Sequence, residues 1–300
     1  MRGVELGSLM MKIFRKILLV CALLVPTMLV AVPAHAQSAE LEQGMADFYK
    51  ENWDDAIKSL SMAVKKEPQN SLALAYMLHS YYKKKDITTI INQMESQATA
   101  KGNDPIAQAQ LGMAYFLKGI VIPQVLEEAL TEFKNAIRDD SKDSIAYTGM
   151  GMVYFQKRMM PRAKGFFVKA LRINPHDVMA LDRLGNILLV DEKKPDEALQ
   201  LYERIVIEMP NYPDGHYYAG SAMYDLKRYD DAIPHLIKAR DLDPKGVVQG
   251  FDAATLLGDC YLRLNRFADA SDAFERALKM QPSSEYAKIK LGKAKSGKAI

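Results

Sequence analysis

The stretch that decides the fold is FDAATLLGDCYLRLNRFADASDAFERALKMQP, residues 251–282. Its apolar and small residues return at intervals of three and four, which predicts two short helices with apolar sides facing each other. These residues are Leu257, Gly258, Tyr261, Phe267, Ala270, Phe274 and Ala277, and Pro282 marks the end of the second helix. A single hairpin of this size cannot bury its whole apolar surface, so we expect neighbouring copies.

Residues equivalent to Gly258 recur along the chain. They are Gly44, Leu78 in place of a glycine, Gly112, Gly151, Gly185, Gly220, Gly258 and Gly292, separated by 34, 34, 39, 34, 35, 38 and 34 residues. A 34-residue period of helix–turn–helix units is the signature of tetratricopeptide repeats, and nearly all of the chain after its first 36 residues resembles that family. The resemblance implies an all-α fold, a right-handed α-solenoid of about seven hairpins with a C-terminal capping helix.

The repeats divide the chain into a leader at residues 1–36, an array at 37–282, and a basic capping helix and tail at 283–300. The expected units lie near 37–70, 71–104, 105–143, 144–177, 178–212, 213–246 and 251–284. The second unit is eroded, because Leu78 replaces the glycine and Ile90 and Gln97 replace two alanines. We retain it because both flanking steps are 34 residues.

Three units depart from the period. Residues 118–123 predict a turn in the third unit that is about five residues too long, and its apolar Ile120, Val121 and Ile122 either cap the edge of the stack or touch a partner. The fifth unit has one extra residue around Lys194 and Pro195. Residues 245–250 follow the sixth unit and exceed the period by about four residues.

The first 36 residues predict an export signal. Basic residues up to Lys16 precede an apolar run from Ile17 to Val32, and Ala34 and Ala36 form a small-x-small exit. This pattern is typical of a secretory signal peptide, so we expect cleavage after Ala36 and a periplasmic or secreted protein. An uncleaved leader that anchors the protein in the inner membrane is the alternative.

Removing this leader takes away four basic residues and one acidic residue, which leaves the two kinds in equal number. A clustered basic surface for nucleic acid is therefore not predicted. Only Cys260 remains outside the leader, so no internal disulfide is expected there.

Motifs for catalysis or cofactors are lacking. The histidines His79, His176, His216 and His235 are scattered over separate units without metal-binding spacing. Gly149 and Gly151 lack the third glycine of a nucleotide-binding loop. We therefore expect neither an enzyme nor a metal or other cofactor.

The family resemblance implies a concave groove lined by places 5, 9, 12 and 13 of each unit. Its early, apolar half would hold His79, Tyr82, Met113, Phe116, Met152 and Phe155. Its later, polar half would hold Asp182, Asn186, Tyr217, Ser221, Tyr224, Asp225, Thr255, Asp259 and Arg263. A partner with an apolar segment beside a polar or basic one would suit both halves.

The phenylalanines of the early half either pack between first helices or face the groove, whereas we expect Met113 and Met152 to be exposed in it. The carboxylate-clamp version of the family carries Lys and Asn at the fifth and ninth places. Here these places hold Ala75 and His79, Ala109 and Met113, and Thr148 and Met152. Recognition of an acidic peptide terminus is therefore not expected.

The sequence thus predicts a non-catalytic adaptor or scaffold that binds a protein or peptide in the bacterial cell envelope. One alternative is a membrane-tethered accessory subunit of a secretion, pilus or polysaccharide-export assembly, with membrane contact only through the uncleaved leader. Another is a glycan-binding protein. Self-association through Ile120, Val121 and Ile122 is a further possibility.

Overall fold

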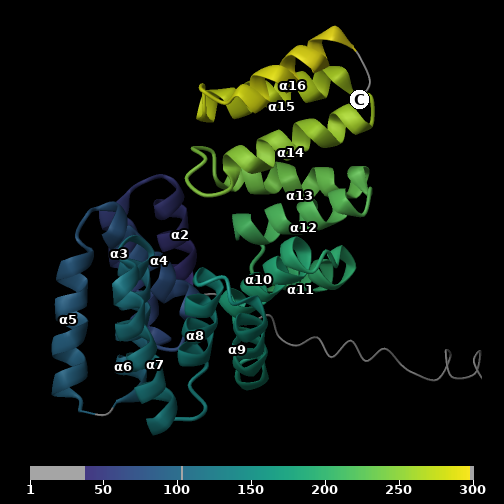
Figure 1. Ribbon diagram of the computed structural model, residues 1–300. Helices are drawn as coiled ribbons and strands as arrows, with labels where there is room; N and C mark the ends of the chain where they lie inside the picture. Colours follow the sequence, from purple (N-terminus) through teal and green to yellow (C-terminus); the bar gives the residue numbers. More distant parts are fainter. Residues whose placement is uncertain (1–37, 103, 298–300) are drawn as a thin grey trace, which may run out of the picture. The chain divides into compact units, whose positions relative to one another are not determined.

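The computed structural model describes residues 38–102 and 104–297, which fold as helices joined by short connections (Figure 1). No strand occurs within these residues. The predicted all-α solenoid is confirmed. The expected leader lies outside the described residues.

Seven successive helix pairs and one final helix make up this part of the chain. The pairs are α2 (Ala39–Tyr49) with α3 (Trp53–Lys66), α4 (Ser71–Lys83) with α5 (Ile87–Ala100), α6 (Pro105–Val121) with α7 (Leu126–Asp139), α8 (Ser144–Gln156) with α9 (Met160–Ile173), α10 (Val178–Asn186) with α11 (Pro195–Glu208), α12 (Pro213–Asp225) with α13 (Tyr229–Leu242), and α14 (Gly250–Arg263) with α15 (Phe267–Met280). The final helix is α16 (Glu285–Ser296).

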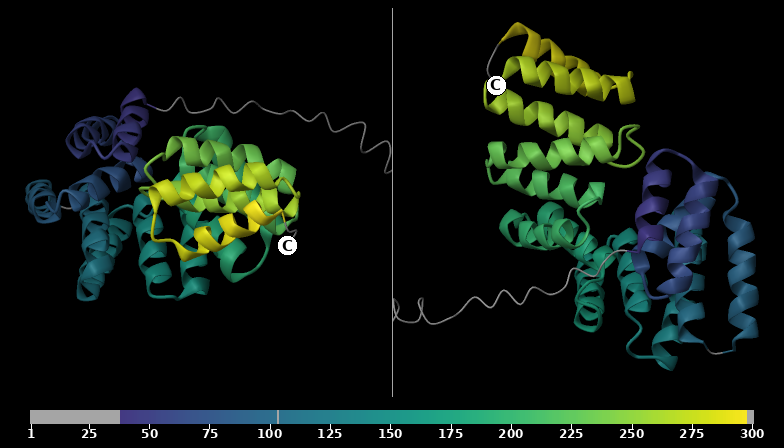
Figure 2. Two further views of the ribbon diagram at one scale, coloured as in Figure 1. Left: turned by 90° about the horizontal axis from the view of Figure 1, so that it is seen from above. Right: turned by 180° about the vertical axis from the view of Figure 1, so that it is seen from behind.

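Each helix packs on the next one in sequence, and the first helices of neighbouring pairs also touch. Figures 1 and 2 show this succession for α12 to α16, which lie one upon the next. Helix α4 also contacts α10, three pairs further along the chain. The first helices therefore line a common side, on which residues distant in sequence meet.

A glycine in the first helix of most pairs gives room for a large side chain of the second. A Cβ atom on Gly151 would lie 2.5 Å from the ring of Phe167, too close for any real contact. The same pairing joins Gly44 to Leu60, Gly112 to Phe133, Gly185 to Tyr202, Gly220 to Leu236 and Gly258 to Phe274. In the eroded pair, Leu78 is 1% exposed and Met94 stands where the others carry Phe, Tyr or Leu. Leu78 is larger than the glycine it replaces, and the flexible side chain of Met94 can adapt to the smaller space that remains.

Polar residues cap most of the first helices. The side chain of the residue before the helix accepts a hydrogen bond from a backbone N–H of the first turn, which satisfies a donor that the helix leaves free. These capping residues are Ser38, Asn70, Asp104, Asp143, Asp177 and Ser284.

The turns within pairs end the first helix with a left-handed residue. Positive φ angles occur at Glu51, Lys85, Arg158, Lys193, Lys227 and Asn265, one in every pair except the third. There the predicted long turn is wrong: α6 stays helical through Val121, and a 3-10 turn, η1 (Pro123–Val125), leads into α7. The added residues lengthen the helix because their apolar, uninterrupted run can continue it.

The fifth pair absorbs its extra residue within a helix. A π-helical turn, η2 (Ile187–Asp191), follows α10 directly, and such a turn accommodates one additional residue. The backbone N–H of Lys194 then bonds Leu188 O at 2.8 Å.

The connection from α13 to α14 is organised by one carboxylate. Asp243 is fully buried and accepts hydrogen bonds from the backbone N–H groups of Val247, Val248, Gln249 and Gly250 at 2.8–2.9 Å. At the start of this connection, Lys245 Nζ donates to Lys50 O at 2.8 Å and pairs with Glu51 at 2.9 Å. The residues beyond the repeat period therefore form an ordered loop that reaches the first pair.

Candidate binding groove

An apolar pocket lies among α4, α6, α8 and α10. Its volume is about 200 Å³, and it is lined by Ala75, Leu78, His79, Met113, Phe116, Leu117, Ile120, Met152, Phe155, Gln156, Met179 and Arg183. Five of the six residues predicted for the early groove line it, and the sixth, Tyr82, lies at the surface with 37% exposure.

Met113 and Met152 line this pocket but are not exposed as we expected. They are 2% and 8% exposed, because adjacent first helices pack around them. Phe116 is also buried, at 7%, and Phe155 is half-buried. The pocket surface thus consists of side chains that also belong to the core, so it is held in place before any partner arrives.

Ile120 lines the same pocket and remains 43% exposed. Val121 and Ile122 next to it are 59% and 45% exposed. The helical extension of α6 therefore adds exposed apolar surface beside the pocket.

An acidic pocket adjoins the apolar one. Its volume is about 140 Å³, and it is lined by Phe48, Ala75, Tyr76, His79, Met179, Asp182, Arg183, Tyr212, Asp214, Tyr218, Val248 and Gln249. Ala75, His79, Met179 and Arg183 line both pockets, so the two pockets lie side by side.

Two carboxylates of the acidic pocket are buried close to one guanidinium. Asp182 is 1% exposed, its Oδ2 lies 3.6 Å from Arg183 Nε, and its Oδ1 has no hydrogen-bond partner. Burial, followed by the negative charge of Asp182, raises the pKa of Asp214 to about 7, although Arg183 acts in the opposite direction. The pocket therefore holds more acidic than basic groups.

His79 stands where the two pockets meet. Desolvation by the surrounding walls lowers the pKa of its imidazole, and the charges of Lys83 and Arg183 act in the same direction. The imidazole is therefore neutral at physiological pH and can donate or accept a hydrogen bond.

Several residues of the acidic pocket escaped sequence analysis. Phe48 and Tyr76 look like ordinary core residues there, and Asp214 lies in the first turn of a helix, where acidic residues are common. Val248 and Gln249 come from the loop beyond the sixth unit. The length of that loop was the one available signal.

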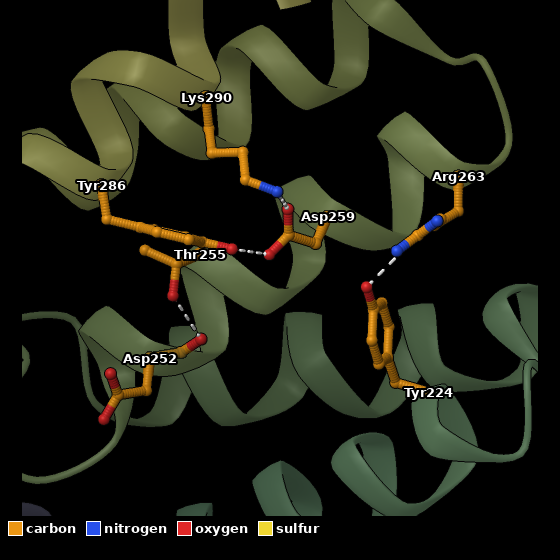
Figure 3. Close-up of polar contacts among 7 residues, drawn as sticks. All are labelled: Tyr224, Asp252, Thr255, Asp259, Arg263, Tyr286 and Lys290. Atoms are coloured by element: carbon orange, nitrogen blue, oxygen red, sulfur yellow. Dashed lines mark hydrogen bonds and ion pairs between the residues drawn. The ribbon is translucent and has the colours of Figure 1, made fainter. Parts of the chain in front are cut away.

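The last predicted groove residues bond to other parts of the same chain, and Asp259 bonds to the end helix α16 (Figure 3). Asp259 is 6% exposed, accepts a hydrogen bond from Tyr286 Oη and pairs with Lys290 Nζ at 2.7 Å. Arg263 Nε donates to Tyr224 Oη at 3.4 Å, and Thr255 Oγ1 donates to Asp252 O at 2.9 Å. Both carboxylate oxygens of Asp259 are therefore bonded to side chains of α16.

The remaining predicted residues lie outside both pockets. Asn186, Tyr217 and Ser221 are half-buried, and Asp225 is exposed. The ring of Tyr217 packs edge-on against Tyr218, with centroids 4.9 Å apart. Of the nine residues predicted for the later half, Asp182 alone lines one of these two pockets.

Reactive and metal-binding groups are scarce in the described residues. Cys260 is buried, and desolvation raises the pKa of its thiol to about 12, which keeps it protonated and unreactive at neutral pH. Within residues 38–297, apart from Asn103, no three His, Cys, Asp or Glu side chains gather as metal ligands would. None of the helices described there combines the length and apolarity that crossing a membrane requires.

A family whose description is "Tetratricopeptide repeat" matches residues 189–251 and 223–291. Among curated proteins, "Superkiller protein 3" of Schizosaccharomyces pombe is 24% identical over 273 residues. That match covers 87% of this chain but 19% of the relative, so the chain spans about a fifth of the relative's length.

Solved structures support the same fold. The TPR protein YrrB, described as having an unusual peptide-binding site, is 24% identical with a TM-score of 0.51, covering 65% of this chain and 96% of YrrB. A chain of the APC/C hetero-tetramer Cut9-Hcn1 is 16% identical with a TM-score of 0.60, covering 83% of this chain and 47% of that chain. At these identities the likeness concerns the fold alone.

Proposed function

We propose, from the premise that this chain is a tetratricopeptide-repeat protein, that it is a non-catalytic adaptor that captures a segment of another protein in its groove. Repeat proteins of this kind generally serve as interaction scaffolds rather than enzymes. The observation that carries the proposal is the apolar pocket, which is lined by buried methionine and phenylalanine side chains and yet remains open. Met and aromatic residues are enriched in protein–protein interfaces.

The bound segment would place an apolar side chain between Met113, Met152 and Phe116. Burying one Leu- or Phe-sized side chain there contributes about 1.5–3 kcal/mol. The pocket is largely formed in advance, so little of this free energy is lost in ordering it.

The cell envelope is the proposed setting. The support is the sequence of residues 1–36, with basic residues, an apolar run and a small-x-small exit. Intact-mass measurement of the protein purified from its source tests this, since export with cleavage leaves Gln37 as the first residue. A mass that retains residues 1–36 would instead favour the anchored form.

Crosslinking in the native envelope, followed by identification of the captured protein, tests the adaptor function. The double variant Met113→Glu/Met152→Glu places two carboxylates in the apolar pocket and should abolish capture. The matched control is Met62→Glu/Ile207→Glu, which adds the same charge at side chains 44% and 72% exposed and outside both pockets. Circular dichroism checks the fold of both. Equal capture by the two variants would refute the proposal.

A further inference from the structure

We propose that the acidic pocket binds the cationic head of a lysine or arginine on the same partner segment whose apolar side chain fills the apolar pocket. The inference rests on the proposed function, because it adds a second anchor to one bound segment. It is carried by two buried carboxylates that lie among aromatic rings directly beside the apolar pocket.

The first observation is an unsatisfied carboxylate oxygen. Asp182 Oδ1 is buried without a hydrogen-bond partner, whereas buried polar atoms nearly always have one. Leaving such an atom unpaired costs about 1–3 kcal/mol, or more for a charged group. An ammonium or guanidinium entering the pocket would supply the missing donor.

The balance of charge favours a cation over an anion. Asp182 and Asp214 face a single basic side chain, Arg183, whose Nε lies 3.6 Å from Asp182. A carboxylate or phosphate ligand would meet Arg183 but also two acidic groups. Once Asp214 has lost its proton, as it does above about pH 7, a second cation would complete the pairing that Arg183 leaves unfinished.

Aromatic rings surround the same space. Phe48, Tyr76, Tyr212 and Tyr218 line the pocket. The face of an aromatic ring attracts a cation, with a contribution of about 0.5–2 kcal/mol that grows as water is excluded. The stem of a lysine or arginine would pack on these rings while its head meets the carboxylates.

The loop before α14 completes the acidic pocket, which shares lining residues with the apolar pocket. Val248 and Gln249 form part of its lining, and Asp243 holds their backbone N–H groups at 2.9 Å. His79 and Met179 line both pockets, so the two lie close enough for neighbouring side chains of one bound segment. The preferred partner motif is therefore an apolar residue close to a basic one.

A phage-displayed library of random dodecapeptides, selected on the full chain, tests this motif. The wild type should enrich peptides that carry an apolar residue near a lysine or arginine. The isosteric variant Asp182→Asn/Asp214→Asn should keep the apolar preference and lose the basic one. The matched control Asp55→Asn/Asp196→Asn, at exposed positions outside the pocket, should select as the wild type does.

The outcomes separate the two proposals. Apolar enrichment without basic residues would overturn the cation pocket and leave the adaptor function standing. Selection of no common motif by the wild type would overturn both. Enrichment of acidic peptides would also overturn the cation pocket.

An affinity comparison needs no variant of the protein, so it remains decisive even if Asp182→Asn fails to fold. One selected peptide is compared with its copy in which acetyl-lysine replaces the lysine. Loss of a charge-assisted hydrogen bond predicts binding weakened about 10- to 100-fold. Equal affinities would refute the inference.

Discussion

Small residues at helix crossings are steric requirements of this fold. Ala163 in α9 has no exposed surface, so a larger side chain there must displace its neighbours. Ala163→Leu should therefore lower the free energy of unfolding by about 1–3 kcal/mol. Lys164→Leu next to it removes a half-buried ion pair with Glu192 at the surface, which is worth about 0–1 kcal/mol. Differential scanning calorimetry should show the larger fall in Tm for Ala163→Leu, and equal falls would contradict the packing described.

Asp214 should make stability depend on pH. Its pKa is about 7 in the folded chain and 3.8 in an exposed carboxyl, so between these values the folded state binds a proton that the unfolded state has released. Its stabilising contribution is therefore lost as pH rises through about 7. The groups around Asp214 are Asp182 and Arg183 of α10, Tyr212, and Gln249 of the loop.

Asp214→Asn removes this titration. Its Tm should exceed that of the wild type by an amount that grows from pH 5 to pH 8. Burial of an incompletely paired group costs about 1–3 kcal/mol, and each kcal/mol corresponds to about 2–4 °C in a chain of this size. Asp55→Asn, at an exposed position outside the pocket, is the control. A difference in Tm that is constant with pH would show that Asp214 is not the group responsible.

At the scale of elements, the loop before α14 depends on close backbone approach. A Cβ atom on Gly250 would lie 1.9 Å from the carbonyl oxygen of Asp243. Gly250→Ala must therefore shift the loop and should cost about 1–3 kcal/mol or more in a denaturant titration.

Gly165→Ala is the matched control, because nothing lies within 4 Å of the added atom in the exposed middle of α9. It should raise stability by about 0.5–1 kcal/mol, since alanine favours helix over glycine. Similar effects of the two substitutions would argue against the tight loop.

The repeat pattern predicted which segments form helices, because spacing, turn residues and small crossing residues are all local signals. It did not predict how extra residues are absorbed. The third pair lengthens α6, the fifth forms the π-helical η2, and the loop at 245–250 folds around Asp243. Each solution depends on contacts outside the unit that carries the insertion, so the period alone could not distinguish a longer helix from a longer turn.

At the scale of the whole array, Asp177 joins three helix pairs. Its carboxylate caps α10 and accepts hydrogen bonds from Ser71 Oγ at 2.8 Å and Thr148 Oγ1 at 2.7 Å. Ser71 begins α4, 106 residues earlier in the chain. Asp177→Ala should lose a cap worth about 1 kcal/mol and two hydrogen bonds to a charged group worth about 1.5–3 kcal/mol each.

Asp143→Ala provides the comparison, because Asp143 caps α8 in the same way while its Oδ2 has no partner. It should cost about 1 kcal/mol or less. Hydrogen exchange should show faster opening of α4 together with α10 only in Asp177→Ala. Equal destabilisation by both substitutions would mean that the link to Ser71 contributes nothing.

The acidic pocket could not be predicted from the repeats for a similar reason. It draws Phe48 from the first pair, Tyr76 from the second, Asp182 from the fifth, Asp214 from the sixth and Gln249 from the loop. The periodic pattern describes contacts between neighbours, whereas this pocket depends on contacts between units far apart.

Repeat proteins commonly change length by gaining or losing whole units, since each unit needs only its neighbours. Here, Phe48 and Gln249 line the same pocket, and Lys245 bonds Lys50 and Glu51 in the connection between α2 and α3. These long-range contacts remove that freedom. If one unit between the first pair and the loop before α14 were duplicated or deleted, the array could still fold, but these two regions would no longer be in contact. The count of units over this span is thus fixed by geometry, and engineers wishing to extend the protein should add copies after residue 282.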